Sequence, residues 1–368
     1  MSILGLHHIT LVSSDAQRTV DFYTKVLGLR FVKKTVNFDD PGSYHLYFGD
    51  ETGKPGSAVT FFEWKSDPAR GIVVPRGKSG IGGTHHFALI VEDYDGLLKW
   101  KRRLNDLGIS VDGPLDRQYF QSIYMRDPDG VIVEIATRGP GWTVDEAPDK
   151  IGTEFREPPA QMLINNRNQE KIAATTWPEP VPEITPDMAL SHGMHHITAI
   201  SSDIERTHAF YHDLLGMRRV KMTSNFDDPG SAHWYWGVGA GQPGTLITYF
   251  ERKPDRTRHA QMGIGQTHHF ALAVEDEKVQ LEWRARLQKA GFRVSPVMDR
   301  IYFKSIYSND PDGHIVELAT IPPGFPVDEP VAELGTHLML PPWLEQARGA
   351  IESTLTPLHV DPWELQQP

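Results

Sequence analysis

LHHITLV, at residues 6–12, opens a pattern that recurs as THHFALIV (84–91), MHHITAIS (194–201) and THHFALAV (267–274). Each copy starts with a histidine pair and continues with the apolar-rich alternation of a buried or half-buried β-strand. Two later stretches, VIVEIAT (131–137) and HIVELAT (314–320), carry a glutamate in a strand of the same kind. Two histidines and one carboxylate are the ligand set of a mononuclear non-haem iron site. The pattern therefore predicts both a strand framework and a metal centre.

The chain is a tandem duplication. NFDDPGS occurs at residues 37–43 and again at 225–231, and DPDG occurs at 127–130 and again at 310–313. Identical words in the same order indicate an internal repeat. We therefore expect a first half at residues 1–170, a second half at 189–368, and a stiff, proline-rich linker at 171–188 between them.

Each half is itself double. Residues 8–12 predict a strand, and residues 15–27 predict an amphipathic helix that Asp15 caps and Gly28 ends. Three short strands follow before the next histidine pair, where the same order restarts with a second helix predicted over residues 93–108. The chain is thus expected to be an α+β protein of four βαβββ modules that pair into two barrels.

Composition excludes several classes of protein. The 368 residues carry a formal net charge of −11 and contain no cysteine. A chain of this charge without a basic stripe is not expected to bind nucleic acid, and the lack of cysteine removes disulfides and thiolate chemistry. No apolar run is long enough for a membrane helix, and His8 leaves no room for a cleaved signal peptide. These features predict a cytoplasmic protein without a membrane partner, and they allow a homo-oligomer.

Strand alternation selects one histidine of each pair. His8 shares a strand face with Thr10, whereas His7 shares the more apolar face with Ile9 and Leu11. The apolar face should pack under a helix, and the mixed face should line a functional cleft. The better candidates for metal ligands are therefore His8, His86, His196 and His269. Their neighbours are expected to be structural or to support the ligands: His7, His85, His195 and His268.

The ordered set of motifs resembles the vicinal oxygen chelate superfamily, also called the glyoxalase/extradiol dioxygenase fold. The similarity is greatest to its hydroquinone-type ring-cleaving dioxygenases, through LHHITLV, FVKKTVNFDDPGSYHLYFGDETGKPGS, THHFALAV, DRIYFKSIY, DPDGHIVELAT and PPGFPVDEP. The resemblance covers nearly the whole chain apart from the linker. It implies paired modules that form a curved sheet around one metal ion, with Fe(II), or alternatively Mn(II), as cofactor and O2 as co-substrate.

By the same resemblance, the metal ligands are His8, His269 and Glu317, and the substrate pocket contains Arg300 and Tyr307 with His268 and Thr10 nearby. This chain departs from the pattern because its second and third modules keep a full set of their own: His86, Glu134 and His196, with Arg117 and Tyr124. Pairing module one with four and two with three would give two complete sites. Pairing one with two and three with four would give two sites from the same six ligands, so the sequence leaves the pairing open.

The resemblance implies an extradiol-type ring-cleaving dioxygenase that uses Fe(II) to insert O2 into a hydroquinone or a related small dihydric phenol. Arg300 would hold a substrate oxygen, Tyr307 would donate a proton or a hydrogen bond, and His268 could move protons. Two alternatives stay open. One is a glyoxalase-like isomerase in which Glu63 or Glu251 supplies a fourth ligand, and the other is a protein that only binds a metal or an aromatic compound. The NFDDPGS stretch is expected to form a turn, with a lid over the site as the alternative.

Overall fold

Each of the four histidine-pair stretches forms the first strand of a module, as predicted. These strands are β1 (Gly5–Ser13), β5 (Thr84–Val91), β9 (Met194–Ser201) and β13 (Thr267–Val274) in the computed structural model, which describes residues 1–67 and 71–363. The helices that follow them are α1 (Ala16–Asp21), α2 (Tyr94–Asp106), α4 (Ile204–His208) and α5 (Glu277–Lys289).

Three further strands complete each module. In the first two modules they are β2 (Arg30–Asn37), β3 (Asp40–Gly49), β4 (Ala58–Glu63), β6 (Asp112–Asp116), β7 (Gln121–Arg126) and β8 (Ile132–Thr137). In the last two they are β10 (Arg218–Asn225), β11 (Asp228–Gly237), β12 (Leu246–Glu251), β14 (Met298–Asp299), β15 (Lys304–Asn309) and β16 (Ile315–Thr320). Short helices α3 (Gln169–Ala174) and α6 (Arg348–Thr354) lie in the segments that follow β8 and β16.

An aspartate caps each of the four module helices. Asp15 accepts a hydrogen bond from the backbone N–H of Arg18 at 2.9 Å, and Asp93, Asp203 and Asp276 act in the same way. α1 and α4 then continue as π-helical turns over Phe22–Val26 and Ala209–Leu214. The helix predicted over residues 15–27 is therefore present, but its second half widens to π geometry.

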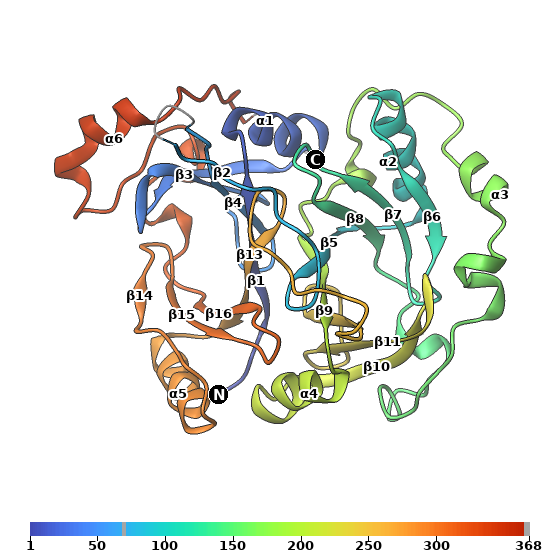
Figure 1. The fold of residues 1–368 in the computed structure, drawn as a ribbon. Coiled ribbons are helices and arrows are strands. Elements are labelled where there is room, and N and C mark those ends of the chain that lie inside the picture. Colours follow the sequence, from blue (N-terminus) through green and yellow to red (C-terminus); the bar gives the residue numbers. More distant parts are fainter. Residues whose placement is uncertain (68–70, 364–368) are drawn as a thin grey trace.

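The strands form two eight-stranded sheets that combine modules from both halves of the chain (Figure 1). The first has the order β14-β15-β16-β13-β1-β4-β3-β2, and the second has the order β10-β11-β12-β9-β5-β8-β7-β6. Module one pairs with module four through antiparallel β1 and β13, and module two pairs with module three through β9 and β5. This is the predicted α+β fold, and it settles the pairing that the sequence left open. The sheets do not coincide with the expected halves at residues 1–170 and 189–368, because each sheet takes one module from each half.

The two DPDG turns connect one sheet to the other. As predicted, each turn joins two antiparallel strands, β7 to β8 and β15 to β16. Asp129 accepts hydrogen bonds from the backbone N–H and the hydroxyl of Ser14, at 2.9 and 2.7 Å. Asp312 receives the equivalent bonds from Ser202. In each case the aspartate of a hairpin in one sheet accepts hydrogen bonds from the serine that lies just before a helix in a module of the other sheet.

The segments that follow β8 and β16 fold back over the outer strands of the sheets. Lys33 of β2 is fully buried and pairs with Asp328 and Glu329 of the segment after β16. Lys221 of β10 makes the equivalent pairs with the segment after β8. A buried ammonium group needs such partners, because leaving it unpaired would cost several kcal/mol. The paired lysines therefore fix both connecting segments against the edge strands β2 and β10 of their sheets.

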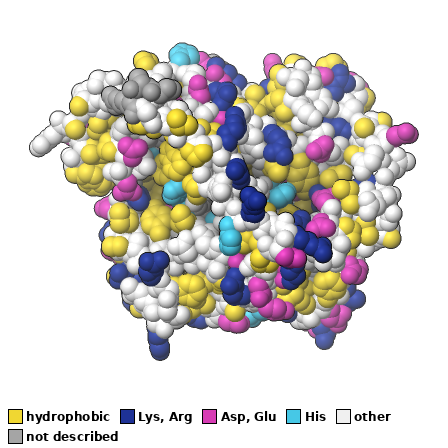
Figure 2. Space-filling view, viewed as in Figure 1, with side chains coloured by type: hydrophobic (Ala, Val, Ile, Leu, Met, Phe, Trp, Pro, Cys, Tyr) yellow, Lys and Arg dark blue, Asp and Glu magenta, His cyan; other side chains and the backbone are white. Residues whose placement is uncertain are grey.

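None of the described helices is both long and apolar enough to cross a bilayer. Figure 2 shows side chains of both charges on one face of the molecule, with several lysines and arginines near its middle. The chain has more acidic than basic residues, but basic side chains gather near the middle of this face.

Candidate metal centres and substrate cavity

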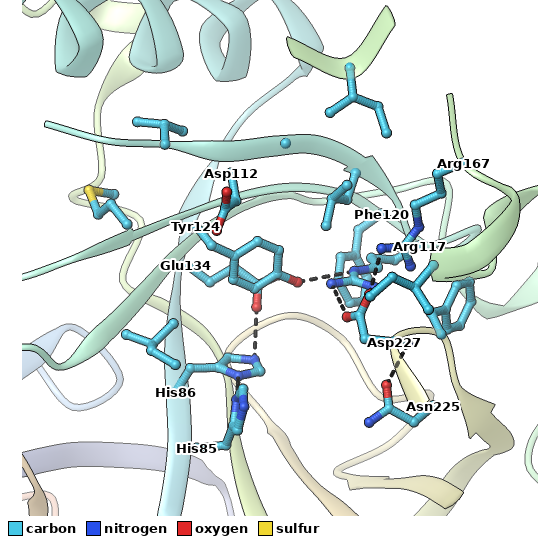
Figure 3. Close-up of a pocket in the computed structure, with 18 of the residues that line it drawn as sticks. His85, His86, Asp112, Arg117, Phe120, Tyr124, Glu134, Arg167, Asn225 and Asp227 are labelled. Carbon is cyan, nitrogen blue, oxygen red and sulfur yellow. Dashed lines mark hydrogen bonds and ion pairs between the residues drawn. The ribbon is translucent and has the colours of Figure 1, made fainter. Parts of the chain in front are cut away.

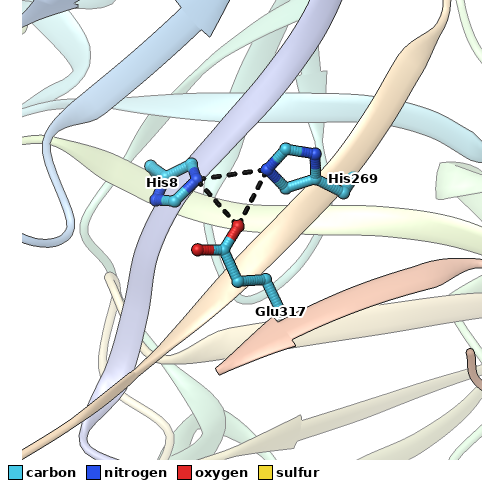
Figure 4. A group of neighbouring side chains, drawn as sticks. All are labelled: His8, His269 and Glu317. Atoms are coloured by element: carbon cyan, nitrogen blue, oxygen red, sulfur yellow. Dashed lines mark hydrogen bonds and ion pairs between the residues drawn. The ribbon is translucent and has the colours of Figure 1, made fainter. Parts of the chain in front are cut away.

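The first triad, His8, His269 and Glu317, lies at the centre of the first sheet (Figure 4). His8 Nε2 and His269 Nε2 are 3.3 and 2.9 Å from Glu317 Oε2, and 3.3 Å from each other. The strand register explains this arrangement, because His8 of β1 lies opposite Ala271 of β13, and Ala271 lies beside Glu317 of β16. Ala271 has only a methyl group, so the longer side chains on either side converge above it.

The second triad, His86, His196 and Glu134, repeats this geometry in the second sheet. His86 Nε2 and His196 Nε2 are 2.9 and 3.3 Å from Glu134 Oε2, and 3.2 Å apart. Ala88 takes the place of Ala271, since it lies opposite His196 and beside Glu134. The structure thus brings the six predicted ligands together as two buried triads, each built from two modules.

Hydrogen bonds determine which nitrogen of His8 carries a proton. The carbonyl oxygen of Thr320 is 3.2 Å from His7 Nε2, so this nitrogen donates. Burial and the neighbouring His8 lower the pKa of His7 to about 3, so its ring is neutral and its Nδ1 is an acceptor. His8 Nδ1, 2.9 Å away, therefore donates to His7, which leaves the lone pair of His8 Nε2 facing Glu317. The first histidine of the pair thus orients the second so that its Nε2 lone pair points into the triad.

The Nδ1–Nδ1 contact recurs in the other three histidine pairs, at 2.7 to 2.9 Å. His268, predicted as a proton carrier, is held in this way against His269, and its ring packs against Phe62 and Trp64 at 5.2 and 6.2 Å between centroids. Burial lowers the pKa of His268 to about 3, so its ring is neutral near pH 7. The structure therefore places His268 in contact with His269 of the triad, as His7 is in contact with His8.

The carboxylates of both triads are well suited to a cation. Ser305 Oγ donates to Glu317 Oε1, and Ser122 Oγ donates to Glu134 Oε1. Burial would raise the pKa of each glutamate, but the neighbouring histidines lower it well below its usual value. Among the described residues, neither Oε2 atom has a hydrogen-bond partner of good geometry, although each faces two histidine nitrogens. One divalent ion would satisfy all three converging atoms, and two imidazoles with one carboxylate suit Fe(II), Mn(II) or Zn(II).

An arginine–tyrosine pair lies beside each triad. Arg117 Nε donates to Tyr124 Oη at 3.1 Å, and the Tyr124 ring is 5.7 Å from the His86 ring. Arg300 Nε donates to Tyr307 Oη at 3.3 Å, and the Tyr307 ring is 5.6 Å from that of His269. The four predicted pocket residues are therefore next to the ligands.

The NFDDPGS turns hold these arginines in place. Arg117 pairs with Asp227 at 2.8 Å, and Arg300 pairs with Asp39 at 3.1 Å. The expected turn is present but shorter than the stretch: it comprises Phe38 and Asp39 between β2 and β3, and Asn37 Oδ1 accepts from the backbone N–H of Asp39 at 3.0 Å. The sequence offered no signal for these pairs, because the aspartates of each turn come from a module distant in the chain from the arginine.

A chain of polar side chains that the sequence reasoning missed leads away from the first triad. Thr10 Oγ1 is 3.0 Å from His269 Nε2 and 2.8 Å from Thr60 Oγ1. His45 Nε2 contacts Thr60 at 3.0 Å, and Tyr47 Oη contacts His45 Nδ1 at 2.9 Å. The signal was present in the sequence, since SYHLYF and SAHWYW both keep a histidine and a tyrosine two positions apart on one strand face.

The two triads open onto cavities of very different size. The second triad lies in a cavity of about 760 Å³ that is also lined by Phe120, Tyr124 and Arg117 (Figure 3). The first borders a cavity of about 20 Å³, lined by Arg300 and Tyr307 among others. A single water needs roughly 10–15 Å³ of such volume, whereas sites for small organic ligands typically measure about 300–1,000 Å³. Of the two, the second site has room for an aromatic ring.

Neither glutamate considered as a fourth ligand joins a triad. Glu63 Oε1 accepts from the backbone N–H of Ala16 at 2.8 Å, and its Oε2 pairs with Lys65. Glu251 faces the start of α4 and pairs with Lys253. Both side chains lie on the helix side of their strands. The isomerase alternative required one of them as a fourth metal ligand, and neither is in position to serve as one.

Comparison with known proteins agrees with this architecture. The chain is 34% identical over 357 residues to the "Putative ring-cleaving dioxygenase MhqO" of Bacillus subtilis (strain 168), with 97% of each chain covered. It is 27% identical over 357 residues to the "Chlorohydroquinone/hydroquinone 1,2-dioxygenase" of Sphingobium indicum, with 95% of each covered.

Solved structures have the same fold. The crystal structure of a "putative dioxygenase" from Bacillus subtilis matches with a TM-score of 0.76 at 32% identity, covering 98% of this chain and 99% of that one. Glyoxalase I from Zea mays matches with a TM-score of 0.56 at 18% identity over 86% and 92% of the two chains, a likeness of fold alone. A family model described as Glyoxalase/Bleomycin resistance protein/Dioxygenase superfamily matches residues 5–135 and 193–318. The chain therefore belongs to this superfamily.

Proposed function

We propose that this protein is a ring-cleaving dioxygenase of the extradiol type that inserts O2 into a hydroquinone or a related dihydric phenol. One observation carries the proposal: a buried triad of two histidines and a glutamate and an adjacent arginine–tyrosine pair line the same cavity of about 760 Å³. The relatives named as ring-cleaving and hydroquinone dioxygenases support the same reading.

The proposed cofactor is Fe(II), with Mn(II) as the alternative, held by His86, His196 and Glu134 and by the equivalent first triad. With three protein ligands, such an ion would still be able to bind a ring oxygen and O2. His85 and His195 contact the Nδ1 atoms of the ligands His86 and His196, so they hold the ligand rings in register with the glutamate.

The side chains around the ion would position the ring. Tyr124 lies beside His86 and is the proposed hydrogen-bond partner of a substrate hydroxyl, whereas Arg117 would stabilise negative charge on a second ring oxygen. Burial raises the pKa of Tyr124 above its usual value, so its hydroxyl stays protonated and can donate. In the first site Tyr307 and Arg300 lie in the equivalent places, with Thr10 and His268 against the proposed ligand His269. Because the cavity there measures about 20 Å³, the same roles would require that site to open before a ring could enter.

Oxygen uptake by protein reconstituted anaerobically with Fe(II) tests the proposal. Hydroquinone, methylhydroquinone, chlorohydroquinone and catechol would be supplied in turn, and the ring-opened acid would be identified by mass. We expect one O2 consumed per ring, with Glu134→Gln losing most of the turnover because its site has the room for substrate. Glu317→Gln is the matched variant of the smaller site. Full metal occupancy without oxygen uptake on any of these rings would contradict the proposal.

A further inference from the structure

The large cavity differs in charge from the small one. Glu63-Trp64-Lys65 of the first half corresponds to Glu251-Arg252-Lys253 of the second, so an arginine replaces a tryptophan beside the second site. Arg252 lines the large cavity, with its guanidinium 5.7 Å from the centre of the Phe250 ring. Trp64, in contrast, packs against His268 of the first site. The second site thus has a cationic side chain at the position where the first site has an apolar one.

A second cation enters the same cavity from outside the sheet. Arg167 precedes α3 and lines the cavity, with its side chain only 7% exposed. Its Nε donates to the carbonyl of Met162 at 2.7 Å, and its Nη1 pairs with Asp227. Its Nη2 has no hydrogen-bond partner among the described residues. A buried guanidinium nitrogen without an acceptor is costly, which points to an acceptor that the protein chain does not supply.

The carboxylates of the cavity wall do not balance these cations. Asp227 is shared between Arg167 and Arg117, whose Nη2 is 2.8 Å away, and Arg252 pairs with the exposed Asp228. Two aspartates therefore serve three guanidinium groups, whereas in the first site Arg300 has Asp39 to itself. The other carboxylates that line the cavity are Glu134, which belongs to the triad, and Asp112, which lies apart from Arg117 and Arg167 in Figure 3. The excess positive charge thus lies on the arginine side of the cavity.

We propose that the second site is selective for a dihydric phenol that carries a carboxylate substituent. The ring would lie in the cavity against His86 and Tyr124, and the carboxylate would accept hydrogen bonds from Arg167 with Arg252 as the second cation of the wall. Arginine suits this role because its planar fork matches carboxylate geometry. The cavity of about 760 Å³ leaves room for a substituent beyond a single ring. The inference rests on the proposed function for the identity of the ring, but the charge preference of the cavity is testable by itself.

Ligand binding to the full chain loaded with Zn(II) tests the preference without turnover, because Zn(II) takes the same ligands and does not change oxidation state. Anaerobic calorimetry would compare 2,5-dihydroxybenzoate and 2,5-dihydroxyphenylacetate with methylhydroquinone. We expect at least one of the two carboxylated rings to bind about tenfold or more tightly than methylhydroquinone, at one site per chain, because a charge-assisted contact contributes about that much. The preference should shrink as salt is raised.

Two substitutions locate the effect. Arg167→Gln should lower the ratio of the affinity for the carboxylated ring to that for methylhydroquinone about threefold or more. Arg252→Trp, which restores the residue of the first site, should separately have the same effect. Arg156→Gln removes the same charge from the same connecting segment, but Arg156 is 44% exposed and pairs with Glu154, so the ratio should not change. Arg167→Lys keeps the charge and should retain part of the preference, and thermal unfolding verifies that each variant is folded.

The outcomes separate the inference from the proposed function. Equal affinity for charged and neutral rings, or a preference that survives both Arg167→Gln and Arg252→Trp, would overturn the inference even if hydroquinone consumed oxygen. A carboxylate preference that these substitutions reduce, together with no oxygen uptake by the Fe(II) protein on any ring, would uphold the inference and reject the dioxygenase.

Discussion

Replacing His7 should weaken metal binding at the first site without abolishing it. His7 does not reach Glu317, but it accepts the Nδ1 proton of His8 and so directs the His8 lone pair toward the glutamate. Loss of such a supporting hydrogen bond typically costs about 10–100-fold in metal affinity, or roughly 1.4–2.8 kcal/mol. His269→Ala, in contrast, removes one of three ligands, so it should empty that site while the second triad keeps its ion.

Metal content per chain after equilibration with buffered free metal measures both effects. We expect about two ions in the unmodified protein and one in His269→Ala. His7→Ala should bind two ions at high free metal. As the free metal concentration is lowered, this variant should lose one ion at a concentration about 10–100-fold higher than the unmodified protein does. His7→Gln should restore part of the affinity, because an amide can donate to the Thr320 carbonyl and accept from His8.

His359→Ala is the matched control. His359 is 77% exposed, and it contacts Asp361 and Gln17, not the candidate ligands. Complete loss of the ion in His7→Ala at every metal concentration would make His7 a ligand and overturn the argument from strand alternation. Two ions retained in His269→Ala would reject the first triad as a metal site. One ion in the unmodified protein would mean that one triad is vestigial.

Four other substitutions test separate parts of the structure. Arg117→Ala should lower oxygen uptake about 100-fold while both ions remain bound, as measured by metal analysis, and loss of metal would make the residue structural. Ala88→Leu should displace the side chains on either side of it, with the loss of one ion and a cost of about 1–3 kcal/mol in urea unfolding. Lys33→Met should destabilise the fold by about 3–5 kcal/mol, because two carboxylates lose their buried partner, and unchanged unfolding would contradict this. Asp127→Asn tests linkage: burial raises the pKa of Asp127 from 3.8 to about 6, so its contribution to stability is complete below pH 4 and is lost as the pH rises to 6. The variant should therefore gain up to about 3 kcal/mol relative to the unmodified protein between pH 4 and pH 7, and an equal difference at both pH values would refute the assignment.

Much of the local structure follows from short-range patterns in the sequence. Period-two alternation in the four histidine-pair stretches was enough to predict the strands and selected His8 as the triad histidine. The expectation that the first histidine of each pair would face a helix was wrong, because the strand register shifts at each pair: His7 contacts Phe303 as His8 does, and His85 lines the large cavity with His86. Aspartates before the helices predicted their starts, because a capping side chain acts within a few residues. The repeated words established the duplication and hence the two matching sets of candidate ligands, His8, His269 and Glu317 with His86, His196 and Glu134.

The tertiary structure decided what depends on contacts between distant segments. Both ways of pairing the modules use the same strand faces, so alternation could not distinguish them, and the pairing of β1 with β13 became known only from the sheet. The ion pairs of Arg300 with Asp39 and of Arg117 with Asp227 join modules whose spacing in the sequence carries no information about contact. The difference between a cavity of about 20 Å³ and one of about 760 Å³ likewise arises from how the outer strands and connecting segments pack around nearly identical triads. Ligand identity is a local property of the sequence, whereas space and charge around the ligands are properties of the packing.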